Sequence, residues 1–382
     1  MKKIKSFLFA AVAIALTAPV FTSCGDDGDK GVETIEKIVE NMVSEYTYND
    51  KLVADTKAQS GKNEAVLLVA FGSTWDNSFK AFDKTVEAYK AAFPNADVYM
   101  SFSSDICINR ASQGENYDDE GNLVKRDYYE PRYLLHAIGK AQYGKITVQS
   151  LQVIPGEEFA AVVAAVKKFM NNGYIASAHL DDTYLKNLQA NDGIKMGMPL
   201  LYDPAEDVPE VASRLNTLFG GEASQGVVAF MGHGNPDTYD TFKANVRYTE
   251  LEEELQKLNP NFFVGTVDMA DNYKQDVKAR MQAAGKTSGK VFLHALMSIA
   301  GDHAHNDMAG EGEEYWDESD PESEDNSWFE YFKHSGYDVT VPIVGKHPQG
   351  LLELETIREV WVDHTLYALS FEDAYHSMYP EE

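Results

Sequence analysis

The chain has 382 residues, of which 44% are hydrophobic, and its 61 acidic and 33 basic residues give a formal net charge of −28. This length and apolar content suit two ordinary domains with full cores and exclude general disorder. The acidic excess, without any long basic run, argues against nucleic acid as a partner and favours solubility, with attraction of metal cations as a second consequence.

The first 24 residues have the pattern of an export signal. Three lysines stand among the first five residues, and the apolar stretch 7–20 that follows is too short to span a bilayer comfortably. Ser23-Cys24-Gly25 resembles a bacterial lipobox, in which the cysteine is acylated; an ordinary cleaved signal with an incidental cysteine is the alternative. We therefore expect an exported protein, anchored by lipid at Cys24 to the outer membrane, on its periplasmic or surface face. Only Cys107 then remains in the body, so no intramolecular disulfide can form.

An acidic tether and linker, residues 25–62, follows the signal. Its first residues, 25–30, are polar and acidic, as in the tether of surface-exposed lipoproteins. Residues 33–56 have the spacing of one short amphipathic helix, after which a linker is expected through residue 62.

From Ala65 onward, short apolar strands alternate with longer helical patterns, which predicts parallel sheets covered by helices on both faces. The expected strands are 65–70, 96–102, 145–154, 194–202, 226–231, 262–268, 290–299 and 338–344. Helical patterns include 79–93, 239–258, 273–284 and 351 to about 372. Four strand–helix units followed by four more predict two similar α/β domains in tandem, 63–205 and 206–350, with 351–382 as a C-terminal helix and tail.

Two of the expected strands end in histidines. The apolar run 293–300 breaks at Gly301 and is followed by Asp302, His303, His305 and Asp307. The run 226–231 ends similarly in Gly232-His233-Gly234, where the flanking glycines allow a sharp turn. Ligands of open α/β sheets collect at the carboxyl ends of strands, so these residues predict a metal or proton-transfer site. The alternative is a loop that caps the next helix through Asn306 or Asp307.

Two polar stretches have the composition of insertions. Residues 111–128 are rich in Gly and Asp, as in a surface loop, and residues 311–325 form a dense acidic run shortly after His305. The acidic run is interpreted either as a solvated loop or as a lip that gathers metal ions near the site.

The histidine motifs belong to a longer pattern. Met231-Gly232-His233-Gly234 and the stretch 300–309, Ala-Gly-Asp-His-Ala-His-Asn-Asp-Met-Ala, resemble the anaerobic class II sirohydrochlorin cobalt chelatases of the CbiK family. The resemblance covers most of residues 64–372, with further matches at 67–73, 148–151, 154–159, 197–201 and 264–267.

This resemblance implies an α/β fold of two tandem flavodoxin-like, chelatase-like lobes, with parallel sheets and a tetrapyrrole cleft between them. It implies that His233 and His303 bind the metal ion and that Glu158 assists. The expected ion is divalent cobalt, with iron, nickel and zinc as alternatives, because neutral imidazole suits all four. The same imidazoles could accept the two pyrrole protons. Glu158 would lie in the first helical turn after Gly156, where the helix N-terminus is expected to keep it ionised; a simple first-turn acid is the alternative.

The chain departs from the family pattern in three ways. Gln152 stands where the family commonly has a histidine, which puts an extra ligand at that place in doubt. His305 is an addition that could serve as an alternative or auxiliary ligand. The leader and acidic tether depart most, because corrin synthesis begins in the cytoplasm and an exported enzyme would not meet sirohydrochlorin there.

Two functions from different classes follow. The first is an ATP-independent chelatase that exchanges a divalent metal with sirohydrochlorin, a porphyrin or a corrinoid, consistent with the lack of a phosphate-loop motif. The second is a surface or periplasmic lipoprotein that binds haem, a corrinoid or metal on the same fold without turnover. A metal chaperone that uses the acidic loop is a third hypothesis. The sequence leaves the oligomeric state open.

Overall fold

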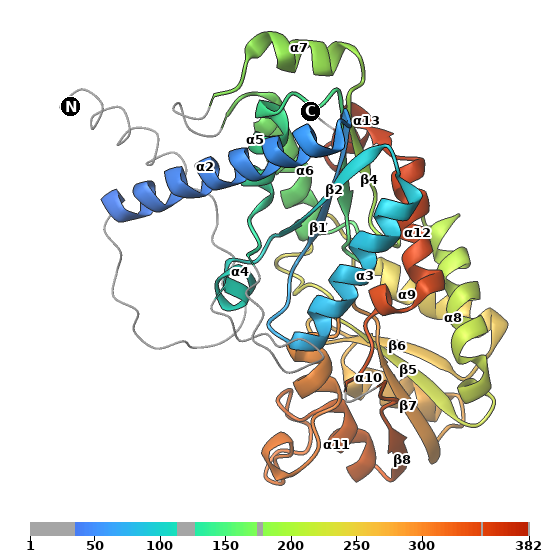
Figure 1. Cartoon of the computed structure of the whole chain (residues 1–382). Coiled ribbons are helices and arrows are strands. Elements are labelled where there is room, and N and C mark those ends of the chain that lie inside the picture. Colours follow the sequence, from blue (N-terminus) through green and yellow to red (C-terminus); the bar gives the residue numbers. More distant parts are fainter. Residues whose placement is uncertain (1–34, 113–126, 174–178, 345–346, 381–382) are drawn as a thin grey trace.

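A computed structural model describes residues 35–112, 127–173, 179–344 and 347–380. Within these ranges the chain forms two β-sheets of mainly parallel strands covered by helices, which confirms the α/β class (Figure 1). The sheets lie one above the other in the view of Figure 1, and helix α12 (Glu355–Leu366) packs beside the first of them. The leader and Cys24 lie outside the described residues.

The first sheet has the strand order β2-β1-β3-β4-β9. Four of its strands are parallel, and β9 pairs antiparallel with β4 at the edge. The strands are β1 (Glu64–Ala70), β2 (Ala96–Phe102), β3 (Lys145–Ser150), β4 (Ile194–Gly197) and β9 (Leu369–Ser370). The helices of this half are α2 (Ile35–Ser60), α3 (Asp76–Ala92), α4 (Asp105–Ser112), α5 (Pro131–Lys140), α6 (Glu157–Met170), α7 (Asp182–Ala190) and α13 (Phe371–Met378).

The second sheet repeats the arrangement, with four parallel strands in the order β6-β5-β7-β8. Its strands are β5 (Val227–Gly232), β6 (Phe262–Thr266), β7 (Gly289–Ala295) and β8 (Tyr337–Thr340). The helices are α8 (Asp207–Ala223), α9 (Val246–Leu258), α10 (Lys274–Ala283) and α11 (Trp328–His334), with the short turns η2 (Ala304–Met308), η3 (Glu313–Tyr315) and η4 (Leu351–Glu353). The boundaries expected at residues 205 and 350 stay predictions.

Five of the eight expected strands end earlier than their apolar runs. β3 ends at Ser150 and β7 at Ala295, although the apolar pattern continues to 154 and 299. The residues beyond the strands are still buried: Leu151 and Leu296 join a core that contains side chains from both sheets. The runs are long because they build the contact between the two halves, which hydrophobic periodicity cannot separate from a strand.

Two terminal segments differ from expectation. Helix α2 continues to Ser60, where a linker was expected, and Asp50 on it bonds His136 Nδ1 at 2.9 Å and Lys140 Nζ at 2.6 Å on α5. The single helix expected over 351–372 is wrong, because α12 ends at Leu366 and the chain then returns to the first sheet as β9 and α13.

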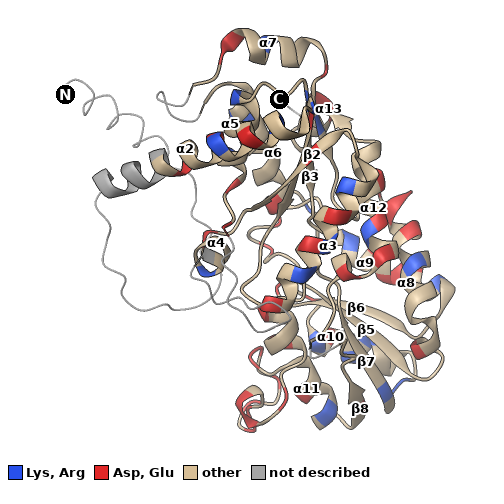
Figure 2. Ribbon diagram, in the orientation of Figure 1, with Lys and Arg blue, Asp and Glu red and all other residues tan. Residues whose placement is uncertain are grey.

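The acidic run 311–325 forms a surface loop with one short 3₁₀ turn, and Figure 2 shows this loop, with its Asp and Glu residues in red, beside α11. Of the insertion expected at 111–128, residues 113–126 lie outside the described ranges. No helix among the described residues is long and apolar enough to cross a bilayer.

Candidate functional site

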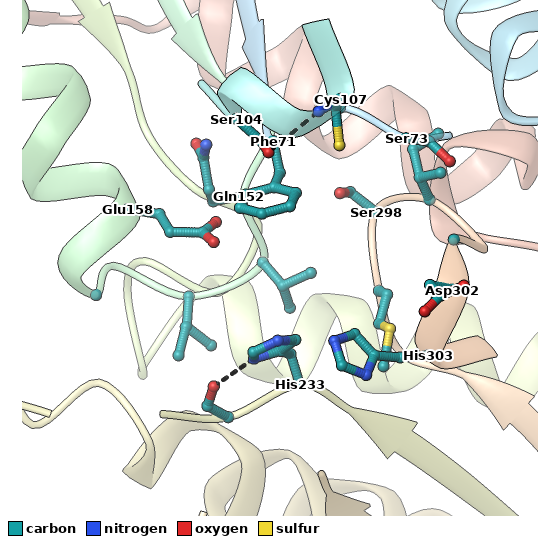
Figure 3. A pocket seen from close by; sticks show the side chains of 18 of the residues that line it. Phe71, Ser73, Ser104, Cys107, Gln152, Glu158, His233, Ser298, Asp302 and His303 are labelled. Carbon is teal, nitrogen blue, oxygen red and sulfur yellow. Dashed lines mark hydrogen bonds between the residues drawn. The ribbon is translucent and has the colours of Figure 1, made fainter. Parts of the chain in front are cut away.

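Loops from the carboxyl ends of both sheets enclose one cavity of about 300 Å³ between the two halves of the molecule. The first sheet contributes residues after β1, β2 and β3, and the second contributes residues after β5 and β7. This is the edge at which parallel strands deliver functional side chains. His233, His303 and Glu158 all line the cavity, so the structure brings the three expected site residues together (Figure 3).

His233 follows β5 directly. Gly232 and Gly234 hold it in place: a Cβ on Gly232 would come within 2.4 Å of the Tyr248 ring, and Gly234 has a φ of +77°, which favours glycine. The His233 side chain is 41% exposed, and its Nδ1 lies 2.7 Å from the carbonyl oxygen of Gly234. Burial in the cavity wall and then the nearby His303 lower the pKa of His233, which favours the neutral imidazole.

His303 lies in the loop after β7, immediately before the π-helical turn Ala304–Met308. Its Nδ1 lies 2.5 Å from Oδ2 of Asp307, one helical turn further on. Burial opposes protonation of His303, but the hydrogen bond to Asp307 and the charges of Asp307, Asp268 and Asp302 together raise its pKa. Asp307 is therefore the partner of His303. Asn306 and Asp307 both lie inside this turn and do not precede a helix, so the alternative in which one of them caps the next helix is wrong.

The two imidazoles face each other at the end of adjacent strands. β5 and β7 are paired in the sheet, and the ring centroids of His233 and His303 are 4.8 Å apart with an angle of 84° between the planes. His233 and His303 are the same residue type, yet their pKa values are shifted in opposite directions within one site. Such divergence is common where two groups have different chemical tasks.

Glu158 lies in the first turn of α6 on another wall of the cavity. Figure 3 shows its carboxylate turned into the same space as the two imidazoles. The side chain is exposed towards the cavity, but the protein atoms around the cavity disfavour its charged form, and this desolvation raises the pKa of Glu158 to about 7. We expected the helix N-terminus to keep Glu158 ionised; that expectation is wrong, because desolvation outweighs the helix dipole here.

Gln152 lies in the wall of the cavity, whereas His305 lies outside it. Gln152 lines the cavity but is buried, and Ser150 donates a hydrogen bond to its Oε1. His305 lies outside the cavity lining and packs against Trp75, with ring centroids 3.7 Å apart. Burial and then the nearby His347 lower the pKa of His305 to about 4. His305 therefore does not join His233 and His303.

The cavity is not a closed metal cage. No group of three or more His, Cys, Asp or Glu side chains among the described residues is gathered closely enough to hold an ion. The site instead offers two imidazoles side by side, with a carboxyl on a separate wall. A pair of protein ligands leaves several coordination positions open, which suits an ion in transit.

Sequence reasoning missed the residues that tune and shape the site. Asp268, after β6, lies 3.6 Å from His233 Nδ1, and no motif marked it. Phe71 and Ile106 are apolar side chains that are 44% and 38% exposed and line the cavity. Arg110 is the one Lys or Arg among the described lining residues. In the sequence, only the Phe71-Gly72-Ser73 motif after β1 indicated that this segment contributes to the cavity wall.

Comparisons with known proteins confirm the family resemblance. Residues 64–370 match the family described as cobalt chelatase (CbiK). A sirohydrochlorin cobaltochelatase, CbiKC, of Nitratidesulfovibrio vulgaris is 26% identical over 312 residues, which cover 80% of this chain and 91% of that protein. The sirohydrochlorin cobaltochelatase of Salmonella typhimurium is 25% identical over 309 residues, 80% of this chain and 97% of that protein. Among solved structures, SirB from Bacillus subtilis with Fe³⁺ has a TM-score of 0.46 and 12% identity over 80% of this chain and 94% of that one.

Proposed function

The chain belongs to the CbiK family of cobalt chelatases, and on that premise we propose that it inserts a divalent ion into a tetrapyrrole, with His233 and His303 as the ligands of the incoming ion. Metal chelation by this chain follows from its family and from relatives named sirohydrochlorin cobaltochelatase. The observation that carries the assignment of residues is the approach of the two imidazoles to 4.8 Å at one end of the cavity.

The distance between the rings supports a shared ion. An ion bound at about 2.1 Å by one nitrogen of each ring, with a tetrahedral angle, requires ring centroids about 5 Å apart. The two histidines therefore need only small rotations to meet one ion. Cobalt is the expected metal, and the imidazoles also suit iron, nickel and zinc, so the metal supply would contribute to selectivity.

The opposite pKa shifts divide the work between the two rings. The lowered pKa of His233 favours the neutral ring, which can bind an arriving cation directly. The raised pKa of His303 means that metal binding competes with a proton there to higher pH than at His233, because Asp307 stabilises the imidazolium. Asp307 meanwhile fixes the orientation of the ring through Nδ1, which leaves Nε2 for the metal.

Glu158 is suited to accept a pyrrole proton. Insertion of one divalent ion releases two N–H protons from the macrocycle, and the two freed nitrogen lone pairs bind the metal. With a pKa of about 7, Glu158 is partly ionised at neutral pH and can take up one of these protons and pass it to solvent. His303 can accept the other after it has released the ion. No nucleotide is consumed, because metal binding and proton release drive the step.

The cavity walls suit an apolar macrocycle with acidic side chains. The exposed faces of Phe71 and Ile106 would contact the ring plane. Arg110 lies at the same wall and would interact with carboxylates at the edge of the ring. The assay below identifies the native substrate within this class, which comprises sirohydrochlorin, porphyrins and corrinoids.

The test is the absorbance change of sirohydrochlorin or a porphyrin on insertion of Co²⁺ or Fe²⁺. The parent protein should accelerate insertion above the uncatalysed background, and His233→Ala and His303→Ala should each lose most of that acceleration. His376→Ala removes an exposed histidine on α13 and serves as the matched control. Full activity in both site variants would refute the assignment of the two ligands.

We further propose an exported, lipid-anchored form of the enzyme. The support is the leader and the Ser23-Cys24-Gly25 junction in the sequence. This location also favours the second function, capture of a haem or corrinoid without turnover. The same assay separates the two, because a capture protein would bind the macrocycle stoichiometrically and leave the insertion rate at background.

A further inference from the structure

A second pair of imidazoles lies outside the cavity. His305, on the π-helical turn η2, and His347, in the segment between β8 and η4, have ring centroids 5.3 Å apart with an angle of 54° between the planes. Neither residue lines the cavity that contains His233 and His303. The two rings come from segments that are 42 residues apart in the chain (347 − 305), so tertiary structure alone makes them neighbours.

His303 and His305 point to different sides because they are two positions apart on one helical turn. His303 faces His233, whereas His305 is held against Trp75 of the first half of the molecule. Trp75 in turn donates a hydrogen bond to Asp302 at 3.4 Å, which places a carboxylate beside the ring that packs on His305. The packing of its ring against Trp75 therefore holds His305 on the side away from His233.

One ring nitrogen of His305 lacks a hydrogen-bond partner among the described residues. Its Nε2 is buried and has no hydrogen-bond partner among the described residues, and no other histidine nitrogen there is in that position. Buried polar atoms of native proteins are nearly always paired, so an orphaned one calls for a missing ligand. The ring of His347 is the neighbouring imidazole, with its centroid 5.3 Å away, and a cation bound between the two rings would give this nitrogen a partner.

We propose that His305 and His347 form a second, outer site for a late first-row divalent cation such as Co²⁺, Ni²⁺ or Zn²⁺. The centroid distance of 5.3 Å agrees with the value of about 5 Å that two tetrahedral imidazole ligands of one ion require. Water completes the coordination, and the charge of Asp302 offsets part of the charge of the cation. Because only two protein ligands are present, the ion exchanges readily.

The nature of the ligands sets the selectivity of the outer site. Imidazole nitrogens favour late transition metals, whereas the carboxylates of the acidic loop 311–325 favour hard ions such as Ca²⁺ and Mg²⁺. The outer site and the acidic loop can therefore be distinguished by competition. The inference does not require the His233–His303 proposal, since it concerns a different pair of side chains.

The test is a Co²⁺ titration of the full chain in excess Mg²⁺, followed by the visible absorption of bound Co²⁺ and by equilibrium dialysis. The parent should bind two equivalents. A variant with both His233→Ala and His303→Ala should retain one, and adding His347→Gln should weaken that equivalent by at least about tenfold. His305→Ala should have the same effect as His347→Gln, and His376→Ala should have none.

The outcomes separate the two sites. Binding of a single equivalent that the double variant abolishes would overturn the outer site and leave the inner one intact. An equivalent that persists in the double variant but is unchanged by His347→Gln would also overturn it. Circular dichroism checks the fold of each variant, and His347→Gln, at a half-buried surface position, keeps the test valid if His305→Ala fails to fold.

Discussion

Replacement of Asp307 by Asn should shift the pH dependence of metal binding to lower pH. Asp307 raises the pKa of His303, so its removal lowers that pKa, and the neutral, metal-binding ring then forms at lower pH. A hydrogen bond to a charged group contributes about 1.5–3 kcal/mol where it is buried. Asp307 is 44% exposed, so solvent screening leaves about 1 kcal/mol. At 1.36 kcal/mol per pH unit, this predicts a shift of about 0.7 unit.

The variant should also bind metal more weakly at high pH. Asp307 orients the ring of His303 through a 2.5 Å contact, and loss of such a partner typically costs about 10–100-fold in metal affinity. The expected result is therefore a binding curve whose midpoint moves to lower pH while its alkaline plateau falls. A merely structural role for Asp307 would lower the plateau without moving the midpoint.

The assay is Co²⁺ binding measured between pH 5 and pH 9, followed by visible absorbance. It is best done with Glu158→Gln in the background, because the pKa of Glu158, about 7, would otherwise overlap the imidazole titration. Asp338→Asn, an exposed position on β8, removes the same charge away from the site and should leave the curve unchanged. A midpoint that stays in place or moves to higher pH in Asp307→Asn would refute the role assigned to this carboxylate.

Three further predictions concern catalysis, stability and location. Glu158→Gln should lower kcat by about 10²–10⁴-fold with little change in KM, the pattern for a group that acts in the transition state; an equal loss through KM alone would contradict this. Trp361→Ala should lower the free energy of unfolding, measured in urea titrations, by about 3–5 kcal/mol. This fully buried ring on α12 packs in the core shared by both sheets, and its Nε1–H donates a hydrogen bond to the carbonyl oxygen of Gln152 at 3.2 Å. A loss below about 1 kcal/mol would contradict the shared core. Cys24→Ser should release the protein from membranes on cell fractionation, and unchanged partitioning would rule out lipidation at Cys24.

The strand ends explain why the sequence was informative about the site. Parallel strands buried on both faces have continuous apolar runs, and these runs located all eight strands of the two repeated units. Polar residues directly after such a run must lie at the carboxyl edge of the sheet. His233 and His303 were found for that reason, and Glu158 was found through the family resemblance of the segment after β3.

Properties that depend on neighbours from distant segments could not be predicted. The sequence placed Glu158 at a helix N-terminus and predicted an ionised group, but the depth of the cavity decides its pKa. The same limit applies to His233 and His303, which are the same residue type at equivalent strand ends and have opposite pKa shifts. The proton affinity of a side chain depends on its desolvation and on nearby charges, and the residues next to it in the sequence determine neither of these.

The sequence by itself therefore determined the parallel α/β class, the tandem order of strands and the edge at which the histidines lie, because these follow from local periodicity and chain direction. Only the tertiary structure decided which histidines meet. The π-helical turn directs His303 towards His233 and His305 towards Trp75 and His347. It also decided that the chain after α12 returns to the first sheet, through a two-residue pairing with β4. Such contacts depend on how separate elements pack against one another, and side-chain direction at a packed turn is fixed only when its neighbours are in place.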